Sequence, residues 1–371
     1  MVVDAPHPEN ETNKTLQSPF LWRNLKCPMC KEGQDHRVFR VRQFIPKTTE
    51  ADQHVSEYKW MADNSQPAHP PYFALYYCKN CHFADIMADF RHGLISPSAH
   101  QLAKQYARLD GAQADTIKLL GVHTDYEHIN FHSALNMHYL ALHAQLTAPE
   151  DLHDYFKLGR LCLRIAWMYR ERDQGVDIPD GPATCEGRPF HGYPDYQAFL
   201  AEVATYWPEI PRDEQAALRL AAKYFEEAIS ADTRFDEPKE YFAGVKLLME
   251  ILRRCNDHDH AYEVVRGIYN TGMDTRKRNS ELLSKNDTSD RMRLKISAEE
   301  KIINKMMSEA AEMRNEILDR MVARDIEKAR AIARAVPQAN AAQLLTKLVA
   351  GGLRPEVVRR IVAMPEFKNG R

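Results

Sequence analysis

The sequence predicts a mainly α-helical protein with a small β unit near its N-terminal end. Apolar residues recur at helical spacing from Ser96 onward, which is typical of amphipathic helices. Before that point, residues 37–44 and 72–77 are short runs rich in β-branched and aromatic residues, which favour strands. With 371 residues and 44% hydrophobic content, the chain is long and apolar enough for two or three compact units.

Composition excludes several classes of protein. The 50 Lys and Arg residues nearly balance the 52 Asp and Glu, so the chain is neither a basic nucleic-acid coat nor a polyacid. It has no run of about 18 apolar residues, and we expect no membrane insertion. Its first residues lack the basic start and apolar stretch of a signal peptide, so we expect a cytoplasmic protein. The usual glycine-rich phosphate loops are absent, which weakens nucleotide-enzyme interpretations.

The N-terminal part divides into a tail and a small β domain. Residues 1–20 are polar with three prolines, and we expect a flexible tail. Residues 21–95 form the predicted β domain. Between its two predicted strands, residues 46–71 contain four prolines, and we expect a long loop there.

Four cysteines in this β domain form two C-x2-C pairs, Cys27 with Cys30 and Cys78 with Cys81. Two-residue spacing lets one tight turn present both thiolates to one ion, and two such turns supply four soft ligands, which suits Zn²⁺. With four protein ligands no coordination position stays open, so we expect one structural zinc per chain in a zinc ribbon. The free energy of zinc binding, roughly 10–16 kcal/mol in small zinc domains, then contributes to the stability of the folded domain.

Two other interpretations of these cysteines remain. Cys78, Cys81 and His82 match the attachment motif of a c-type haem, but this leaves the first pair unexplained. Cys27-Pro28-Met29-Cys30 resembles a redox motif, which needs a following helix to lower the pKa of its first thiol. A turn leading to a strand is expected there instead.

The rest of the chain is predicted to be a series of helices. A Gly- and Pro-rich break at residues 173–194 interrupts the series, and a small helical tail, residues 337–371, follows Pro337. The predicted helices cover residues 97–120, 125–147, 150–172, 194–206, 212–230, 236–254, 258–270 and 288–336.

Residues 96–272 carry spacings typical of tetratricopeptide repeats, in which small residues let paired helices approach closely. The repeats are degenerate, and an ordinary helical bundle is the alternative. A tetratricopeptide-like α-solenoid is therefore predicted. The matching residues are Tyr155, Leu158, Gly159 and Cys162, then Ala221, Phe225 and Ala228, then Tyr241 and Gly244, then Ala261, Val265 and Ile268.

The segments CPMC, PPYFALYYCKNCHFAD, KLGRLCLRIAWMYRE and YFAGVKLLMEILRR together resemble the bacterial domain of unknown function 2225 family. The resemblance covers about residues 21–270. It implies an N-terminal zinc ribbon followed by tetratricopeptide-like helices, and no particular reaction. The family commonly has glycine after each second cysteine, where this chain has Lys31 and His82.

Other chemistry-bearing residues are better explained structurally. Asp125, His128 and His132 share a face of the predicted helix 125–147, and their spacing is compatible with metal binding. We expect instead that these residues, together with His138 and His143, form an ordinary polar helix face. Cys162 and Cys255 are predicted to be small core or near-core residues. Cys185 and His191 lie in the 173–194 loop, where nothing orients them as a nucleophile pair. Asp257 is expected to cap the helix that follows it.

The C-terminal arm differs from the body in charge and in pattern. Residues 271–371 carry 21 basic and 14 acidic side chains, against 29 and 38 in the remainder. Residues 273–336 are predicted to hold a long charged helix. Its apolar residues recur on average about every 3.9 positions, which is too long for a strict heptad repeat and favours a short docking contact. Packing on the chain's own helices and homodimerisation are alternatives. The stripe consists of Leu294, Ala298, Ile302, Met306, Ala310, Met313, Ile317 and Met321.

These observations predict a non-enzymatic adaptor that binds a protein or peptide partner on its helical surface. The alternative is a zinc-ribbon nucleic-acid-binding protein, because Arg37, Arg40 and Arg42 interleave with Phe39 and Phe44. Residues 21–91 hold only 10 basic against 8 acidic side chains, a weak electrostatic footprint for that role. No nucleophile, base and orienting group form a convincing catalytic set.

Overall fold

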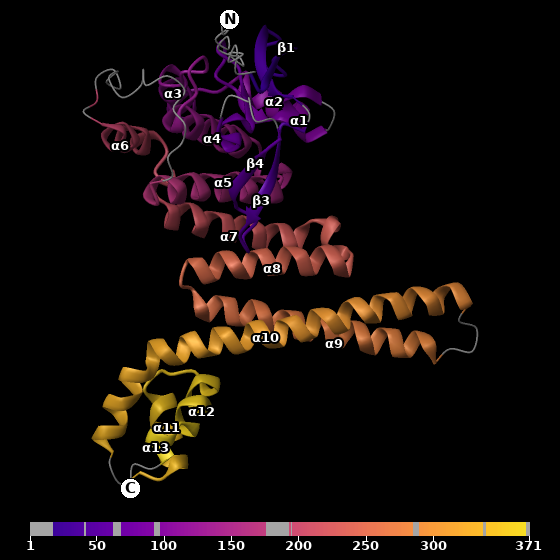
Figure 1. The fold of residues 1–371 in the computed structure, drawn as a ribbon, viewed down its shortest axis with the longest axis vertical. Coiled ribbons are helices and arrows are strands. Elements are labelled where there is room, and N and C mark those ends of the chain that lie inside the picture. The colour runs from indigo at the N-terminus through magenta and orange to yellow at the C-terminus, as the bar shows by residue number, and fades with distance from the viewer. Residues whose placement is uncertain are drawn as a thin grey trace, which may run out of the picture. The chain divides into compact units, whose positions relative to one another are not determined.

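A computed structural model describes residues 18–40, 42–61, 68–92, 97–175, 193, 195–284, 289–336 and 339–368. The chain forms two compact units, Met1–Ala217 and Leu218–Arg371, and the boundary falls within helix α7. Most described residues are helical and the strands form small two-stranded sheets in the first unit, which confirms the predicted fold class (Figure 1). None of the described helices combines the length and apolar character needed to cross a bilayer.

The strands of the first unit form three antiparallel hairpins. The hairpins pair β1 (Phe20–Lys26) with β2 (Gly33–Phe39), β3 (Phe44–Thr49) with β4 (Val55–Trp60), and β5 (Leu75–Tyr77) with β6 (Ala84–Ile86).

The long loop predicted at residues 46–71 is wrong, because the β3–β4 hairpin occupies much of it. Its strands are rich in threonine, valine and aromatic residues, and Pro46 is tolerated because a two-stranded ribbon leaves every strand at an edge. Gln53 turns the chain with φ +68°. The predicted strand at 37–44 is in fact the end of β2 and the start of β3, and the run 72–77 begins as a 3₁₀ turn over Pro70–Phe73.

The helices of the first unit pack around α4 (Phe131–Leu146). It contacts α3, α5, β5 and β6, and every residue from Ser133 to Ala144 is buried. A helix that is buried all round is the centre of a core, so the predicted polar face on this helix is wrong. The other helices are α1 (Met87–His92), α2 (Pro97–Tyr106), α3 (Gly111–Val122), α5 (Tyr155–Asp173) and α6 (Tyr196–Tyr206), and α7 (Glu214–Ala231) begins here and continues into the second unit.

The second unit is built on two long neighbouring helices, α9 (His258–Leu283) and α10 (Asp290–Ala335), which Figure 1 shows side by side beneath α8 (Pro238–Arg254). Asp257 caps α9 by accepting the backbone N–H of His260, as predicted. The contact between α9 and α10 follows a seven-residue period on both helices. Buried residues seven positions apart are His258, Val265, Gly272 and Asn279 on α9, and Ile296, Ile303, Ala310 and Ile317 on α10.

This period corrects part of the predicted stripe, of which Met306, Ala310, Ile317 and Met321 are buried as expected. Leu294 and Ile302 are 73% and 36% exposed, whereas Ile296 and Ile303 are buried. The helix itself matches the one predicted at 288–336, but its contacts with α9 repeat over several turns and are not a short docking contact. The predicted stripe combined residues from two faces of α10. Both faces carry branched apolar side chains, so hydrophobicity alone does not show which face is buried. The alternative that the helix packs on the chain's own helices is confirmed by its contacts with α8, α9 and α12.

The predicted helical tail contains α11 (Ala341–Ala350), α12 (Pro355–Ala363) and α13 (Pro365–Lys368), near the C-terminal end of α10 in Figure 1. Asn340 and Gln343 form a capping box at the start of α11. Its end is a Schellman motif, because Gly352 has φ +84° and Leu353 N–H donates to Leu348 O at 3.2 Å. Local sequence signals alone explain both ends of this helix.

Candidate metal centre

Each cysteine pair lies at the turn of a hairpin. Cys27 and Cys30 lie between β1 and β2, and Cys78 and Cys81 lie between β5 and β6. In both turns the backbone N–H of the first cysteine donates to the carbonyl five residues on, at 2.8 Å. In both, the N–H four residues on donates back to that cysteine's carbonyl, at 3.0 Å from Lys31 and 2.8 Å from His82. The two turns therefore share one backbone geometry.

That geometry needs a left-handed residue after each second cysteine. Lys31 has φ +67° and His82 has φ +60°, where glycine is the residue that fits without strain. The His82 ring is held in place by Tyr77, whose hydroxyl lies 2.6 Å from Nδ1. It packs against Gly121, where an added Cβ would lie within 2.6 Å of the ring. The side chain at position 121 must therefore be absent for His82 to fit.

The four cysteine sulfurs meet at one point. Cys27 Sγ lies 3.6 Å from Cys81 Sγ, and Cys30 Sγ lies 3.5 Å from Cys78 Sγ. All four sulfurs lie within 4.8 Å of one another, and among the described residues they are the one cluster with metal-ligand geometry. Four thiolates around an ion at 2.3 Å would be about 3.8 Å apart, so this arrangement fits one tetrahedral metal ion.

The charge of the centre also suits a cation. Hydrogen bonds from the Cys27 and Cys81 thiols lower the pKa of Cys78, which favours its thiolate form. Hydrogen bonding to Cys78 raises the pKa of Cys27, and burial adds to this. A divalent ion would displace the remaining protons, since thiolates are the form that binds metal.

Neighbouring side chains hold the two hairpins together. Gln34 on β2 donates to Tyr77 O of the other hairpin and accepts from Lys79 N–H at 2.9 Å. Tyr106 on α2 donates to Cys81 O at 2.9 Å. The sequence analysis missed Gln34 and Tyr106, because nothing in their local pattern marks a contact more than 20 residues away. Buried side chains that pack around the cysteines are Tyr76, Phe83, Phe90, Leu102 and Ala144.

A cavity of about 290 Å³ opens beside Cys30 and Cys81. Residues of the first cysteine turn, α2 and α3 line it, and most of their side chains are apolar. The polar residues of the lining are Lys118, His82, Tyr106 and the two cysteines. The apolar wall includes Met29, Ala103, Ala107, Leu109, Ala114 and Ile117.

The structure separates the histidines that the sequence placed on one helix face. Asp125 and His128 precede α4, and the Asp125 carboxylate accepts the backbone N–H groups of Glu127 and His128 at 3.0 Å. The His132 ring instead stacks on Tyr196, with ring centroids 4.3 Å apart. The three side chains therefore do not converge on one metal site, which agrees with the structural interpretation.

The remaining cysteines follow their predicted roles where they are described. Cys162 on α5 is fully buried, and burial raises its pKa. Cys255, which follows α8, is half-buried. Cys185 and His191 lie outside the described residues.

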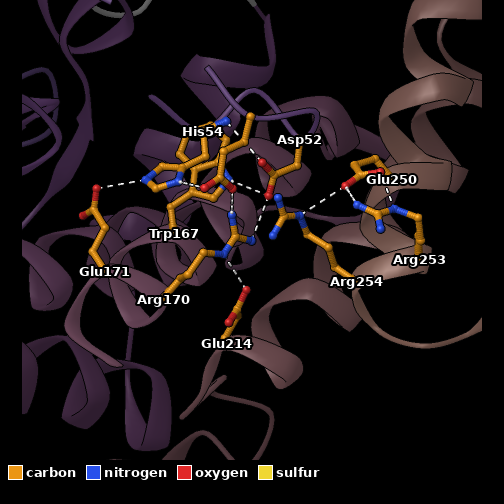
Figure 2. Close-up of polar contacts among 10 residues, drawn as sticks. Asp52, His54, Trp167, Arg170, Glu171, Glu214, Glu250, Arg253 and Arg254 are labelled. Carbon is orange, nitrogen blue, oxygen red and sulfur yellow. Dashed lines mark hydrogen bonds and ion pairs between the residues drawn. The ribbon is translucent and has the colours of Figure 1, made fainter. Parts of the chain in front are cut away.

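A second polar cluster, drawn in Figure 2, joins the tip of the β3–β4 hairpin to α5. Arg170 donates to Asp52 at 2.8 Å, to Glu50 at 2.7 Å and to Glu214 at 2.7 Å. Trp167 Nε1 donates to Asp52 at 3.3 Å. Asp52 is fully buried, so this set of hydrogen bonds compensates for removing its charge from water.

Glu171 continues the same cluster. His54 Nε2 lies 2.9 Å from one carboxylate oxygen of Glu171, and His69 Nε2 lies 2.8 Å from the other. Burial raises the pKa of Glu171, but these two hydrogen bonds outweigh it and hold the pKa below its usual value. The cluster clamps a hairpin that the sequence analysis took for a loop. Its partners lie more than 100 residues apart, so no local pattern reveals it.

Comparison with known proteins gives one match. No curated protein and no solved structure matches the chain. Residues 20–290 match the model of a family described as "uncharacterized protein conserved in bacteria", DUF2225. This span includes all four clustered cysteines, the three hairpins and helices α1 to α9. The chain therefore belongs to the domain of unknown function 2225 family.

Proposed function

We propose that this protein is a non-enzymatic adaptor in which one structural zinc ion holds the N-terminal hairpins and a helical surface binds a protein partner. The observation that carries the proposal is the set of four converging thiols directly beside an apolar cavity. Zinc is preferred because four soft ligands at tetrahedral spacing suit it. The sulfurs are also too close together to enclose a cluster of several metal ions.

A structural role for the metal follows from the ligand set. Four protein sulfurs complete a tetrahedral shell, which leaves no position for water or substrate. Catalytic zinc sites keep such a position open. The expected contribution of zinc is therefore to folding, since it ties the β1–β2 hairpin to the β5–β6 hairpin.

The cavity beside the zinc site suits a partner protein. An apolar cavity of about 290 Å³ has room for one or two apolar side chains of a partner. Cavities of this kind, with few polar groups, are typical of ligand sites rather than of bare surface. The zinc-bound turn forms part of its wall through Met29 and Cys30, so loss of the metal would also deform the binding surface.

The nucleic-acid alternative has less support. Arg37, the first residue of the predicted basic and aromatic pattern, donates to Tyr126 O at 2.8 Å and to Glu127 O at 2.6 Å. Its guanidinium also lies 5.7 Å from the Trp22 ring centroid. Arg37 would have to break these contacts before its guanidinium could bind a phosphate group.

The experiment is affinity purification of the tagged chain from a bacterial host, followed by mass spectrometry. The variant Ala107→Glu puts a charge into the exposed rim of the cavity, and Ala201→Glu makes the same change on the exposed face of α6. We expect a protein that co-purifies with the native chain and with Ala201→Glu, but not with Ala107→Glu. Co-purification that Ala107→Glu leaves intact, or that nuclease treatment removes, would contradict the proposal.

A further inference from the structure

The seam between α9 and α10 contains a buried asparagine near the end of α9. Asn279 occupies a fully buried position of the seven-residue period and is 1% exposed. Its Nδ2 is buried without a hydrogen-bond partner in the described part of the chain. An unpaired buried donor is costly, so a position that retains one is a candidate for binding something that accepts the hydrogen bond.

Asn279 lines a cavity of about 500 Å³ at this end of the seam. The start of α8, the end of α9 and the first turns of α10 form the walls. The apolar part of the wall comes from Pro238, Leu282, Met292, Ile296, Ala298 and Ile302. We call this cavity the Asn279 groove. A volume of this size is typical of sites that hold a ligand.

Apolar surface continues beyond the groove along α10. Leu294 lies one helical turn from Ala298, which is itself one turn from Ile302, and Leu294 is 73% exposed. A small molecule inside the groove would leave Leu294 in water. A peptide chain that crosses the groove would cover it, so the surface suits a peptide better than a compact ligand.

The rim of the groove carries unpaired positive charge. Lys239 and Lys295 line the groove, are exposed, and have no ion pair within the residues that the structure covers. Arg278 is neutralised by Glu299 at 3.2 Å, which leaves Glu237 as the remaining acidic group of the lining. Carboxylates of a ligand would complement the two lysines.

We infer that the Asn279 groove binds an extended acidic peptide segment of a partner protein. One apolar side chain of the peptide enters the groove, a main-chain carbonyl accepts from Asn279 Nδ2, and flanking carboxylates meet Lys239 and Lys295. An extended segment is required because a helical peptide has already used its main-chain carbonyls. This goes beyond the adaptor proposal, and neither depends on the other, since the groove lies in the second unit and its lining contains no metal ligand.

A buried asparagine in a seam also has a known structural role. It fixes helix register, and in coiled coils it pairs with the same residue of a second chain. In that case a second copy of this protein would cover the groove. The apolar strip at Leu294, Ala298 and Ile302 would then be a dimer contact, and the oligomeric state would depend on it.

The test selects peptides from a phage-displayed library of short random sequences on the full native chain. The Asn279→Leu variant serves for counter-selection. We expect enriched sequences with acidic residues on both sides of one branched apolar residue. Failure to enrich any sequence over the counter-selection, or enrichment of basic sequences, would overturn the inference.

The enriched peptide is then labelled and titrated against variants by fluorescence anisotropy. Asn279→Leu should weaken binding by about tenfold or more, as expected for loss of a hydrogen bond from a buried donor. The same variant should raise the melting temperature, because it removes an unpaired polar group. The surface variant Lys239→Glu/Lys295→Glu should abolish binding, and the exposed control Lys347→Glu on α11 should not change it. A native dimer that Leu294→Glu converts to monomers would show that a second copy covers the groove and would overturn the inference.

Discussion

The two units of this chain are held together by different means. In the first, short hairpins are joined by a four-thiol centre and by a buried charge cluster around Arg170. In the second, long helices pack along a repeating apolar seam. The ion pairs of this unit, such as Arg330 with Glu366, are largely exposed to solvent. From this difference we expect the stability of the first unit to depend on pH and on a metal ion, and that of the second to depend on hydrophobic packing.

The chain offers a convenient way to observe the units separately. All four tryptophans, at positions 22, 60, 167 and 207, lie in the first unit. Tryptophan fluorescence therefore reports the first unit alone. Far-UV circular dichroism reports both, and the second unit contributes through its long helices.

Metal removal should give the largest difference between the units. Cys78→Ser, or chelation of the native protein, should unfold the hairpins, because zinc binding contributes roughly 10–16 kcal/mol in small zinc domains. The tryptophan transition should be lost while the dichroism transition of the second unit persists. Elemental analysis should give one zinc per native chain. Cys255→Ser, which changes a half-buried cysteine of the second unit, is the control and should retain both zinc and the tryptophan transition.

The charge cluster should give the next largest effect. Asp52→Ala leaves the buried Arg170 without one of its carboxylates, and breaking a buried pair in this way costs about 3–5 kcal/mol. Glu57→Ala, on the same hairpin, removes an exposed carboxylate paired with Lys47 and should leave the melting temperature nearly unchanged. Equal effects of the two variants on tryptophan-detected unfolding would refute the clamping role of the cluster.

The seam of the second unit provides a test of helix register. Ile303→Ala removes a buried side chain and should destabilise the second unit by about 2–5 kcal/mol, measured by denaturant-induced loss of dichroism. The neighbouring Ile302→Ala should have a small effect, because Ile302 is 36% exposed. The reverse order would support the stripe that the sequence suggested.

The smallest effect concerns pH. Burial lowers the pKa of His138 on α4 to about 3. In the unfolded chain this histidine gains a proton below about pH 6.5, but the folded protein does not bind that proton until near pH 3. Stability of the first unit is therefore lost as pH falls between these values, by about 2 kcal/mol from this one group between pH 6.5 and pH 5.

The matched variants are His138→Leu, which removes the buried group, and His128→Leu, which removes an exposed histidine. Only His138→Leu should flatten the pH dependence of tryptophan-detected stability. Comparing the variants at each pH cancels the contribution of acid-induced metal release. An equal slope for His138→Leu and the native chain would mean that this histidine titrates normally in the folded protein.

Local chemistry determined much of what the sequence predicted correctly. The spacing within each cysteine pair suits a turn that presents two thiolates, and the structure brings the pairs together. Asp257 caps α9, and most helices appear close to their predicted ranges, because caps and periodicity act within a few residues. The mainly α-helical class follows from the same short-range rules.

Tertiary structure decided the rest. Residues 44–60 form a hairpin because Asp52 and His54 find partners on α5, more than 100 residues away. His138 and His143 on α4 are buried because other elements enclose that helix. On α10, Ile303 is buried and Ile302 is not, since the position of α9 selects one of two apolar faces. Hydrophobicity specifies which side chains can be buried, and only the packed neighbours determine which of them are.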